Sequence, residues 1–245
     1  MPSSINLGWA ARLTRPLRVA ARRLLFRKTP QNRTIFLVDG FNLYHSVRDA
    51  SRDLRLGGRD TRWLNIRQMC ASYLSAIGDN AQIVDIYYFT AIARHLLASD
   101  PDIEKRHTSY TDCLADTGVS VEFARFKKKK ISCPHCRQTI VRHEEKETDV
   151  AIASKLLEVC HYDQCDTVII VSGDTDIVPA VHTVRRMFPT KRIGFLLPYN
   201  RHNKELILLS PKTHFLIAKT TYPKFQFPDP YVAAGGKLTP KPPKW

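Results

Sequence analysis

Short apolar, often β-branched runs recur through the middle of the chain, and each has the length of a single strand. The run from Thr34 to Val38 ends in Asp39-Gly40, a pair typical of a turn. The run from Thr167 to Val171 is apolar at nearly every position, as expected of a strand buried on both faces. Strands are therefore predicted at 34–38, 83–89, 119–123, 167–171 and 193–197, with 215–217 as a candidate sixth.

Between these runs, apolar residues recur at helical spacing. One predicted helix carries Ile103, Tyr110, Cys113 and Leu114 on one face, and another carries Val150, Ala153, Leu156, Leu157 and Cys160. Alternation of strands and helices predicts an α/β fold in which helices cover both faces of a mainly parallel sheet. With 245 residues and 43% hydrophobic content, the chain can build one such domain.

The charge balance narrows the set of partners. Lys and Arg number 38 against 23 Asp and Glu, a formal net charge of +15. Such a charge attracts polyanions, so nucleic acid is the first candidate and an anionic membrane surface the second. A basic tail without a bound partner is the plain alternative.

The two ends differ from the middle in composition. Residues 1–32 form a basic N-terminal arm without Asp or Glu, which could be a nucleic-acid arm, a membrane-surface helix or a transit peptide. Residues 221–245 form a tail rich in Pro and Gly, predicted to be extended and poorly ordered. No apolar run approaches the ~20 residues that span a bilayer, the first residues lack a secretory apolar core, and the six Cys do not form a disulfide framework. We therefore expect a cytoplasmic protein.

Acidic residues follow two of the predicted strands. Asp39 comes after the first strand, and Asp174 and Asp176 come after the fourth, where ligands bind in open α/β sheets. Asp149, near the start of a helix, shares its periodicity with Ala153, Leu156 and Cys160. A carboxylate beside that apolar face needs compensation from a divalent cation, from Lys146 or from the helix N-terminus.

Each acid also has an ordinary structural explanation. Asp39-Gly40 alone is typical of a turn, Asp174 or Asp176 alone of a helix N-cap, and Asp149 alone of a first helical turn. Their joint placement at strand ends favours a site, because hard cations with oxygen ligands relieve the repulsion among converging carboxylates.

At these residues the sequence resembles the NYN domain family, a branch of the PIN-like nuclease superfamily. The resemblance rests on Phe36 to Leu43, on Glu144 to Val150, on Val171 to Asp176 followed by Pro179, and on Tyr88-Phe89-Thr90. It covers roughly 33–220. It implies a three-layer α/β/α sandwich of the PIN-like, Rossmann-like kind, and RNA cleavage that depends on Mg²⁺ or Mn²⁺. Asp39, Asp149, Asp174 and Asp176 fall on the family's acidic positions, Asn42 on a polar position and Ser172 on a small hydroxyl.

The resulting hypothesis is an endoribonuclease in which the Asp cluster holds the metal that activates water. Asn42 would orient a carboxylate or contact phosphate, and Lys146 would neutralise charge or pair with an acid. A basic run would contact phosphates without reading sequence, or else form a solvated loop. The run comprises Arg125, Lys127, Lys128, Lys129 and Lys130. RNA is the expected substrate, and DNA stays open.

The basic run opens an insertion at about 125–143 that also holds Cys133-Pro134-His135-Cys136. This Cys pair is half of a zinc site, because structural Zn²⁺ takes four ligands. Three other functions compete with the nuclease. They are an RNA-binding module without turnover, a phosphatase-like enzyme with Asp39 as nucleophile, and a Toprim-type site built on Asp174 and Asp176. Position 41 is Phe, where a phosphatase would have a second Asp, and a Toprim site leaves Asp149 unexplained.

Overall fold

The centre of the structure is a six-stranded sheet in which all neighbouring strands run parallel. The computed structural model describes residues 31–56, 61–132, 136 and 139–243. The strand order is β3-β2-β1-β6-β7-β8. These strands are β1 (Asn32–Asp39), β2 (Ala81–Thr90), β3 (Ser120–Phe123), β6 (Thr167–Val171), β7 (Arg192–Leu197) and β8 (His214–Leu216). All six predicted strands are confirmed to within two residues at each end.

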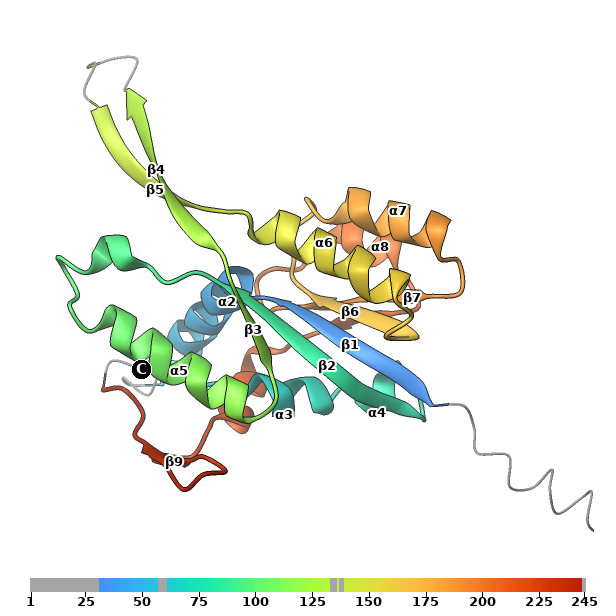
Figure 1. Ribbon diagram of the computed structural model, residues 1–245, viewed down its shortest axis with the longest axis horizontal. Coiled ribbons are helices and arrows are strands. Elements are labelled where there is room, and N and C mark those ends of the chain that lie inside the picture. The colour runs from blue at the N-terminus through green and yellow to red at the C-terminus, as the bar shows by residue number, and fades with distance from the viewer. Residues whose placement is uncertain (1–30, 57–60, 133–135, 137–138, 244–245) are drawn as a thin grey trace, which may run out of the picture. The chain divides into compact units, whose positions relative to one another are not determined.

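Helices cover both faces of this sheet, so the predicted three-layer α/β/α fold is confirmed (Figure 1). One layer contains α2 (Gly40–Asp53), α3 (Ile66–Ala71), α4 (Leu74–Ile77) and α5 (Ile103–Asp116). The other contains α6 (Thr148–His161), α7 (Val178–Met187) and α8 (Lys204–Leu209). A short 3₁₀ helix, η1 (Arg94–Leu96), precedes α5.

The two-residue period of β1 explains why there are two cores. Phe36 and Val38 pack in the cluster with α2, α3 and α5, whereas Ile35 and Leu37 pack in the cluster with α6, α7 and α8. All four side chains are almost fully buried. Alternate side chains of a strand point to opposite faces, so a strand that is apolar at every position is suited to the middle of such a sandwich.

The order of strands creates a switch point between β1 and β6. After β1 the chain builds β2 and β3 on one side of it, and later builds β6, β7 and β8 on the other side. Val38 of β1 pairs with Val171 of β6, so Asp39 and Ser172 follow side by side at the carboxyl ends. In open parallel sheets the crevice at such a switch point is the usual ligand site.

The basic insertion forms a β-hairpin between β3 and α6. Strands β4 (Arg125–Ser132) and β5 (Thr139–Lys146) pair antiparallel as a two-stranded sheet separate from the central one (Figure 1). Lys127 pairs with Glu144 and Lys130 with Val141 along the backbone. No strand was predicted there, because the run of charged residues lacks the apolar alternation that marks one.

The C-terminal segment differs from the extended, poorly ordered tail predicted for it. A 3₁₀ helix, η2 (Lys219–Phe225), is followed by the short strands β9 (Tyr231–Val232) and β10 (Leu238–Thr239). Tyr222 and Phe227 are buried in the core beside Trp63, and Trp63 Nε1 donates to the Pro228 carbonyl at 3.3 Å. A few aromatic residues thus anchor a segment whose Pro content suggested disorder.

Two other expectations concern the ends of the chain and membranes. Residues 1–30, most of the basic N-terminal arm, lie outside the described residues. Within the described part of the chain, no helix combines the length and the apolarity needed to cross a bilayer.

Candidate metal centre

Asp39 lies where β1 ends and α2 begins, and the residue is 5% exposed. Oδ1 accepts from the backbone N–H of Asn42 at 2.9 Å, which caps α2. Oδ2 accepts from the Ser172 hydroxyl at 2.8 Å. Asp39 therefore joins the start of α2 to the residue that follows β6.

The electrostatics of Asp39 reveal other carboxylates nearby. Burial raises the pKa of the Asp39 carboxyl to about 6, although its hydrogen bonds to Asn42 and Ser172 oppose the rise. Asp149 and Asp174 add to it, because their negative charges disfavour ionisation of Asp39. Residues far apart in the sequence thus influence one another at this end of the sheet.

The loop after β6 is held in place by hydrogen bonds. Asp174 N–H donates to Ser172 Oγ at 3.1 Å, and Asp176 N–H donates to Asp174 Oδ1 at 3.1 Å. Helix α7 begins only at Val178, and its N-cap, Ile177, makes no side-chain capping bond. Asp174 and Asp176 are therefore not the N-cap of α7, which removes the simplest structural explanation for them.

Gly173 lets this loop pack tightly. A Cβ atom at this position would lie 1.8 Å from the carbonyl oxygen of Arg201, in the segment after β7. The Gly173 N–H donates to Asn42 Oδ1 at 3.1 Å. The Asn42 side chain thus holds the loop, which is fixed between α2 and Arg201.

Asp149 reaches the same place from α6, where it lies in the first turn. Its side chain is exposed, while Leu156 and Cys160 on the same helix are buried. Although the residue is exposed overall, partial desolvation of its carboxyl, and then the charges of Asp174 and Asp176, raise the pKa of the Asp149 carboxyl. Glu147 lies two residues before Asp149 and has a left-handed backbone (φ 81°). This conformation turns the chain from β5 into α6.

Three carboxylates form a compact group. One oxygen from each of Asp149, Asp174 and Asp176 lies within 4.8 Å of the other two. Oxygens bound to one Mg²⁺ or Ca²⁺ lie at about 2.0–2.6 Å from it, so adjacent ligands are roughly 3–3.7 Å apart and opposite ones about 4–5 Å apart. The three carboxylates are thus close enough to share one divalent cation once their side chains adjust. Asp39 lies outside this group of three, and is linked to it through Ser172 and Asp174 N–H.

The structure describes only some of the other residues that the sequence placed in the site. Arg125 is exposed at the start of β4. The side chains of Lys127 to Lys130 and of Lys146 fall outside the described part of the structure. The same holds for Cys133, whereas Cys136 is exposed and outside any disulfide, so the zinc prediction rests on residues that the structure describes only in part.

One feature of α2 was missed by the sequence patterns. Phe41, Tyr44, His45 and Arg48 recur at helical spacing beside Asp39, on the side of α2 away from buried Leu43 and Val47. Their spacing (i, i+3, i+4, i+7) was the available signal.

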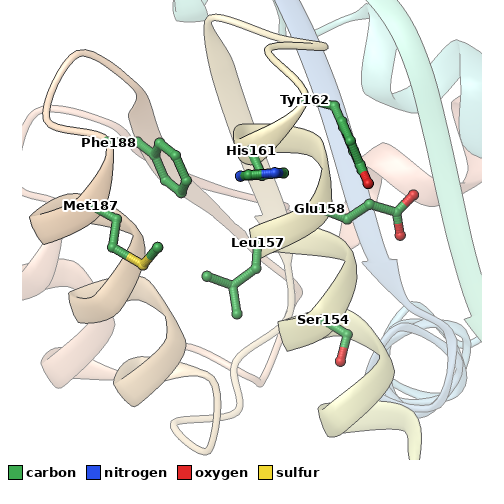
Figure 2. Close-up of a pocket in the computed structure, with 7 residues that line it drawn as sticks. All are labelled: Ser154, Leu157, Glu158, His161, Tyr162, Met187 and Phe188. Carbon is green, nitrogen blue, oxygen red and sulfur yellow. The ribbon is translucent and has the colours of Figure 1, made fainter.

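A separate pocket lies between α6 and α7, away from the carboxylates. It is lined by Ser154, Leu157, Glu158, His161, Tyr162, Met187 and Phe188. Figure 2 shows Leu157 and His161 facing Met187 and Phe188 across it. These residues belong to the later turns of α6, whereas Asp149 lies in its first turn, and the pocket takes no part in the acidic group.

Comparison with known proteins shows which family this chain belongs to. The NYN domain family matches residues 33–216, which include all four acids. The chain belongs to the NYN domain family. NYN domains are a branch of the PIN-like nuclease superfamily, so this chain is of a nuclease class that acts on RNA.

A solved structure supports the fold of this NYN domain. A crystal structure described as a protein of unknown function from Vibrio parahaemolyticus aligns with a TM-score of 0.51 at 16% sequence identity. The alignment covers 78% of this chain and 96% of that one. No curated protein matches the chain by sequence.

Proposed function

We propose that this NYN protein is a divalent-metal-dependent endoribonuclease that hydrolyses internal phosphodiester bonds in RNA. The observation that carries the proposal is the meeting of Asp149, Asp174 and Asp176 oxygens within 4.8 Å at the sheet's switch point. Three carboxylates this close repel one another, and a hard cation is the partner that best relieves this repulsion.

The chemistry divides between the ion and the chain. Mg²⁺ or Mn²⁺ held by these three residues would supply Lewis acidity to a water molecule and to the scissile phosphoryl oxygen. Asp39 adds negative charge to the site and fixes the Ser172 hydroxyl, which in turn holds Asp174 N–H. Asn42 holds Gly173, so the two acids of this loop keep their positions relative to α2.

The sequence of the basic hairpin suggests which residues would bind the RNA backbone. Arg125 and Lys127 to Lys130 lie in β4, close in sequence to the helix that carries Asp149. Cations of this kind contact phosphates without base preference and would hold the RNA backbone. Lys146, at the end of β5, would neutralise charge near the acids.

The test is cleavage of RNA by the full chain. A circular single-stranded RNA and a matched circular DNA are incubated with Mg²⁺, Mn²⁺ or EDTA, because only an endonuclease can open a circle. We expect the RNA to be linearised with either metal and to stay intact in EDTA. Asp149→Asn and Asp174→Asn should each lower the rate about a hundredfold or more.

The matched control is Asp112→Asn. Asp112 is an exposed carboxylate of α5 whose ion pair with Lys237 is long, at 3.9 Å, so its loss should leave the rate unchanged. Cleavage by Asp174→Asn at the wild-type rate would disprove the assignment. RNA binding without any cleavage by the wild type would instead identify a binding module.

A further inference from the structure

The exposed face of α2 carries a cluster of rings and cations. Phe41 is 48% exposed and Tyr44 is 37% exposed, and His45 and Arg48 complete the same face. Single exposed aromatic residues are common on soluble proteins and need no explanation. Here two aromatic rings lie beside an imidazole and a guanidinium at helical spacing. Together they form a continuous surface that calls for an explanation.

These side chains contact one another. The rings of Phe41 and His45 meet edge to face with centroids 4.5 Å apart, and those of Tyr44 and His45 with centroids 5.6 Å apart. The Arg48 guanidinium lies over the Tyr44 ring, 5.7 Å from its centroid. Each ring is thus oriented by a neighbour, and ordered rings lose less entropy when a ligand stacks on them.

The cluster begins at the acidic site. Phe41 lies between Gly40 and Asn42, and the Asn42 side chain bonds to Gly173 in the loop of Asp174. Arg48 lies two turns further along α2, about 10 Å from Phe41 along the helix axis. A ligand lying on this face would therefore have one end at the start of α2, next to Asp39 and close to the residue that holds the loop of Asp174.

Positive charge surrounds the rings. Arg201 approaches α2 by donating to Asp49 Oδ2 at 3.2 Å, and its carbonyl packs against Gly173. Partial burial, and then the charges of Arg201 and Arg48, lower the pKa of His45, while Asp49 opposes them. The uncharged form of His45 is thereby favoured, and the guanidinium groups of Arg48 and Arg201 both lie close enough to influence it.

We propose that this face of α2 is a stacking platform for the bases of single-stranded RNA next to the bond that is cut, with Phe41 and Tyr44 as the stacking rings and Arg48 as a phosphate contact. The inference rests on the proposed function, since it places the RNA beside the Asp cluster. Aromatic rings accept any base by its π-face, but only when that base is unpaired and splayed out. The platform therefore selects single strands over duplexes.

The experiment measures binding without cleavage. A fluorescent 12-nucleotide RNA, single-stranded or annealed to its complement, is titrated with the full chain in EDTA. We expect Phe41→Leu and Tyr44→Leu each to weaken single-strand binding about tenfold, and the double variant more, because each substitution removes one ring on which a base stacks. Duplex binding should change by less than twofold. Tyr44→Phe should bind as the wild type does, because it keeps the ring.

The matched control is Tyr162→Leu. Tyr162 is 68% exposed and its ring contacts His161 edge to face at 5.0 Å, much as Tyr44 contacts His45, but it lies at the far end of α6 from Asp149. It should leave both affinities unchanged. The two substituted rings are at the surface, so circular dichroism should show an intact fold.

The outcomes separate this inference from the proposed function. Wild-type single-strand affinity in the double variant, an equal loss for the duplex, or no binding by the wild type would each overturn the platform. If that happens while Asp174→Asn still abolishes cleavage, the nuclease assignment stands. If the double variant loses single-strand binding but the wild type never cleaves, the platform stands and the nuclease assignment fails.

Discussion

Asp39 caps a helix, but burying its carboxylate near other negative charges costs free energy. It caps α2, holds Ser172 and lies almost fully buried beside other carboxylates. An Asn could accept the same bond from Asn42 N–H without carrying a charge. Asp also offers the Ser172 hydroxyl a second acceptor oxygen, which Asn lacks, and it supplies the negative charge that the proposed cation site would use.

The first prediction follows from the raised pKa of Asp39. Well below pH 3.8 both folded and unfolded chains carry the proton on Asp39; as the pH rises from 3.8 to about 6, the unfolded chain releases it first, so the contribution of Asp39 to stability is lost across that window. We expect metal-free Asp39→Asn to exceed the wild type by about 2 kcal/mol above pH 6.5, with a smaller difference at pH 4.

Denaturant unfolding in EDTA at several pH values measures this difference. Added Mn²⁺ should reduce the advantage of the variant, because the ion stabilises the wild type more. A wild-type protein that is more stable than Asp39→Asn throughout the pH range would show that its negative charge is already well compensated without a metal.

Gly173 gives the second prediction. A Cβ atom 1.8 Å from the Arg201 carbonyl must displace one of the two backbones. Gly173→Ala should lose about 1–3 kcal/mol of unfolding free energy, and its RNA cleavage should fall with the misplacement of Asp174. Gly235→Ala is the control, because no atom lies within 4 Å of the Cβ that it would add. Thermal melts and the circular-RNA assay would record both; equal behaviour of the two variants would refute the packing argument.

At the scale of elements, the strands were the most predictable part. β1 and β6 are short, bounded by turns and apolar on both faces, and that pattern has few other solutions. The hairpin was not predictable, because β4 consists largely of Lys residues and its pairing with β5 leaves no periodic apolar signal. Backbone hydrogen bonds, which the side-chain pattern does not encode, define it.

The C-terminal segment was mispredicted for a related reason. Its Pro and Gly content indicated an extended end, yet a single ring, Phe227, packs 4% exposed against Trp63 with centroids 5.7 Å apart. Composition averages over a window, whereas burial depends on a few large side chains.

The third prediction tests that packing. Phe227→Ala should destabilise the fold by about 3–5 kcal/mol, the usual range for a buried Phe. Val232→Ala, in β9 and 57% exposed, should change stability by less than about 0.5 kcal/mol. Urea unfolding of both variants measures this, and a similar small loss in the two would mean that the C-terminal segment contributes little to the core.

The hairpin gives the fourth prediction. Replacing Lys127 to Lys130 with Gln removes four positive charges from β4. The slope of log affinity for single-stranded RNA against log salt should become shallower by up to about 3, since each phosphate contact contributes roughly 0.7. Anisotropy titrations at four salt concentrations supply the slope. An unchanged slope would assign the contacts with phosphate to other residues.

At the scale of the whole molecule, opposite charges are segregated. The chain carries +15 overall, yet Asp39, Asp149, Asp174 and Asp176 gather at one switch point of the sheet. A basic surface attracts RNA from a distance, but an uncompensated acidic site would repel its phosphates. A cation bound as proposed would reconcile these two facts, because it would turn the acidic group into a phosphate-binding centre.

The acidic site could be anticipated from sequence because strand ends of a parallel sheet converge by rule. The sequence could not show which of the four acids would lie together and which would lie apart. Asp149, Asp174 and Asp176 share one compact group, whereas Asp39 is withdrawn into the core and acts through Ser172. That difference depends on rotamers and on packing around Gly173, which no spacing in the sequence specifies.

The most direct test of the account is a calorimetric titration of the metal-free protein with Mn²⁺. The wild type should bind Mn²⁺, Asp174→Asn should lose about a hundredfold in affinity or more, and Asp39→Asn should lose less, since it removes charge but no oxygen of the compact group. Asp112→Asn should bind as the wild type does. A wild type that takes up no Mn²⁺, or an Asp174→Asn variant that binds it equally well, would contradict the claim that these carboxylates exist to hold a cation.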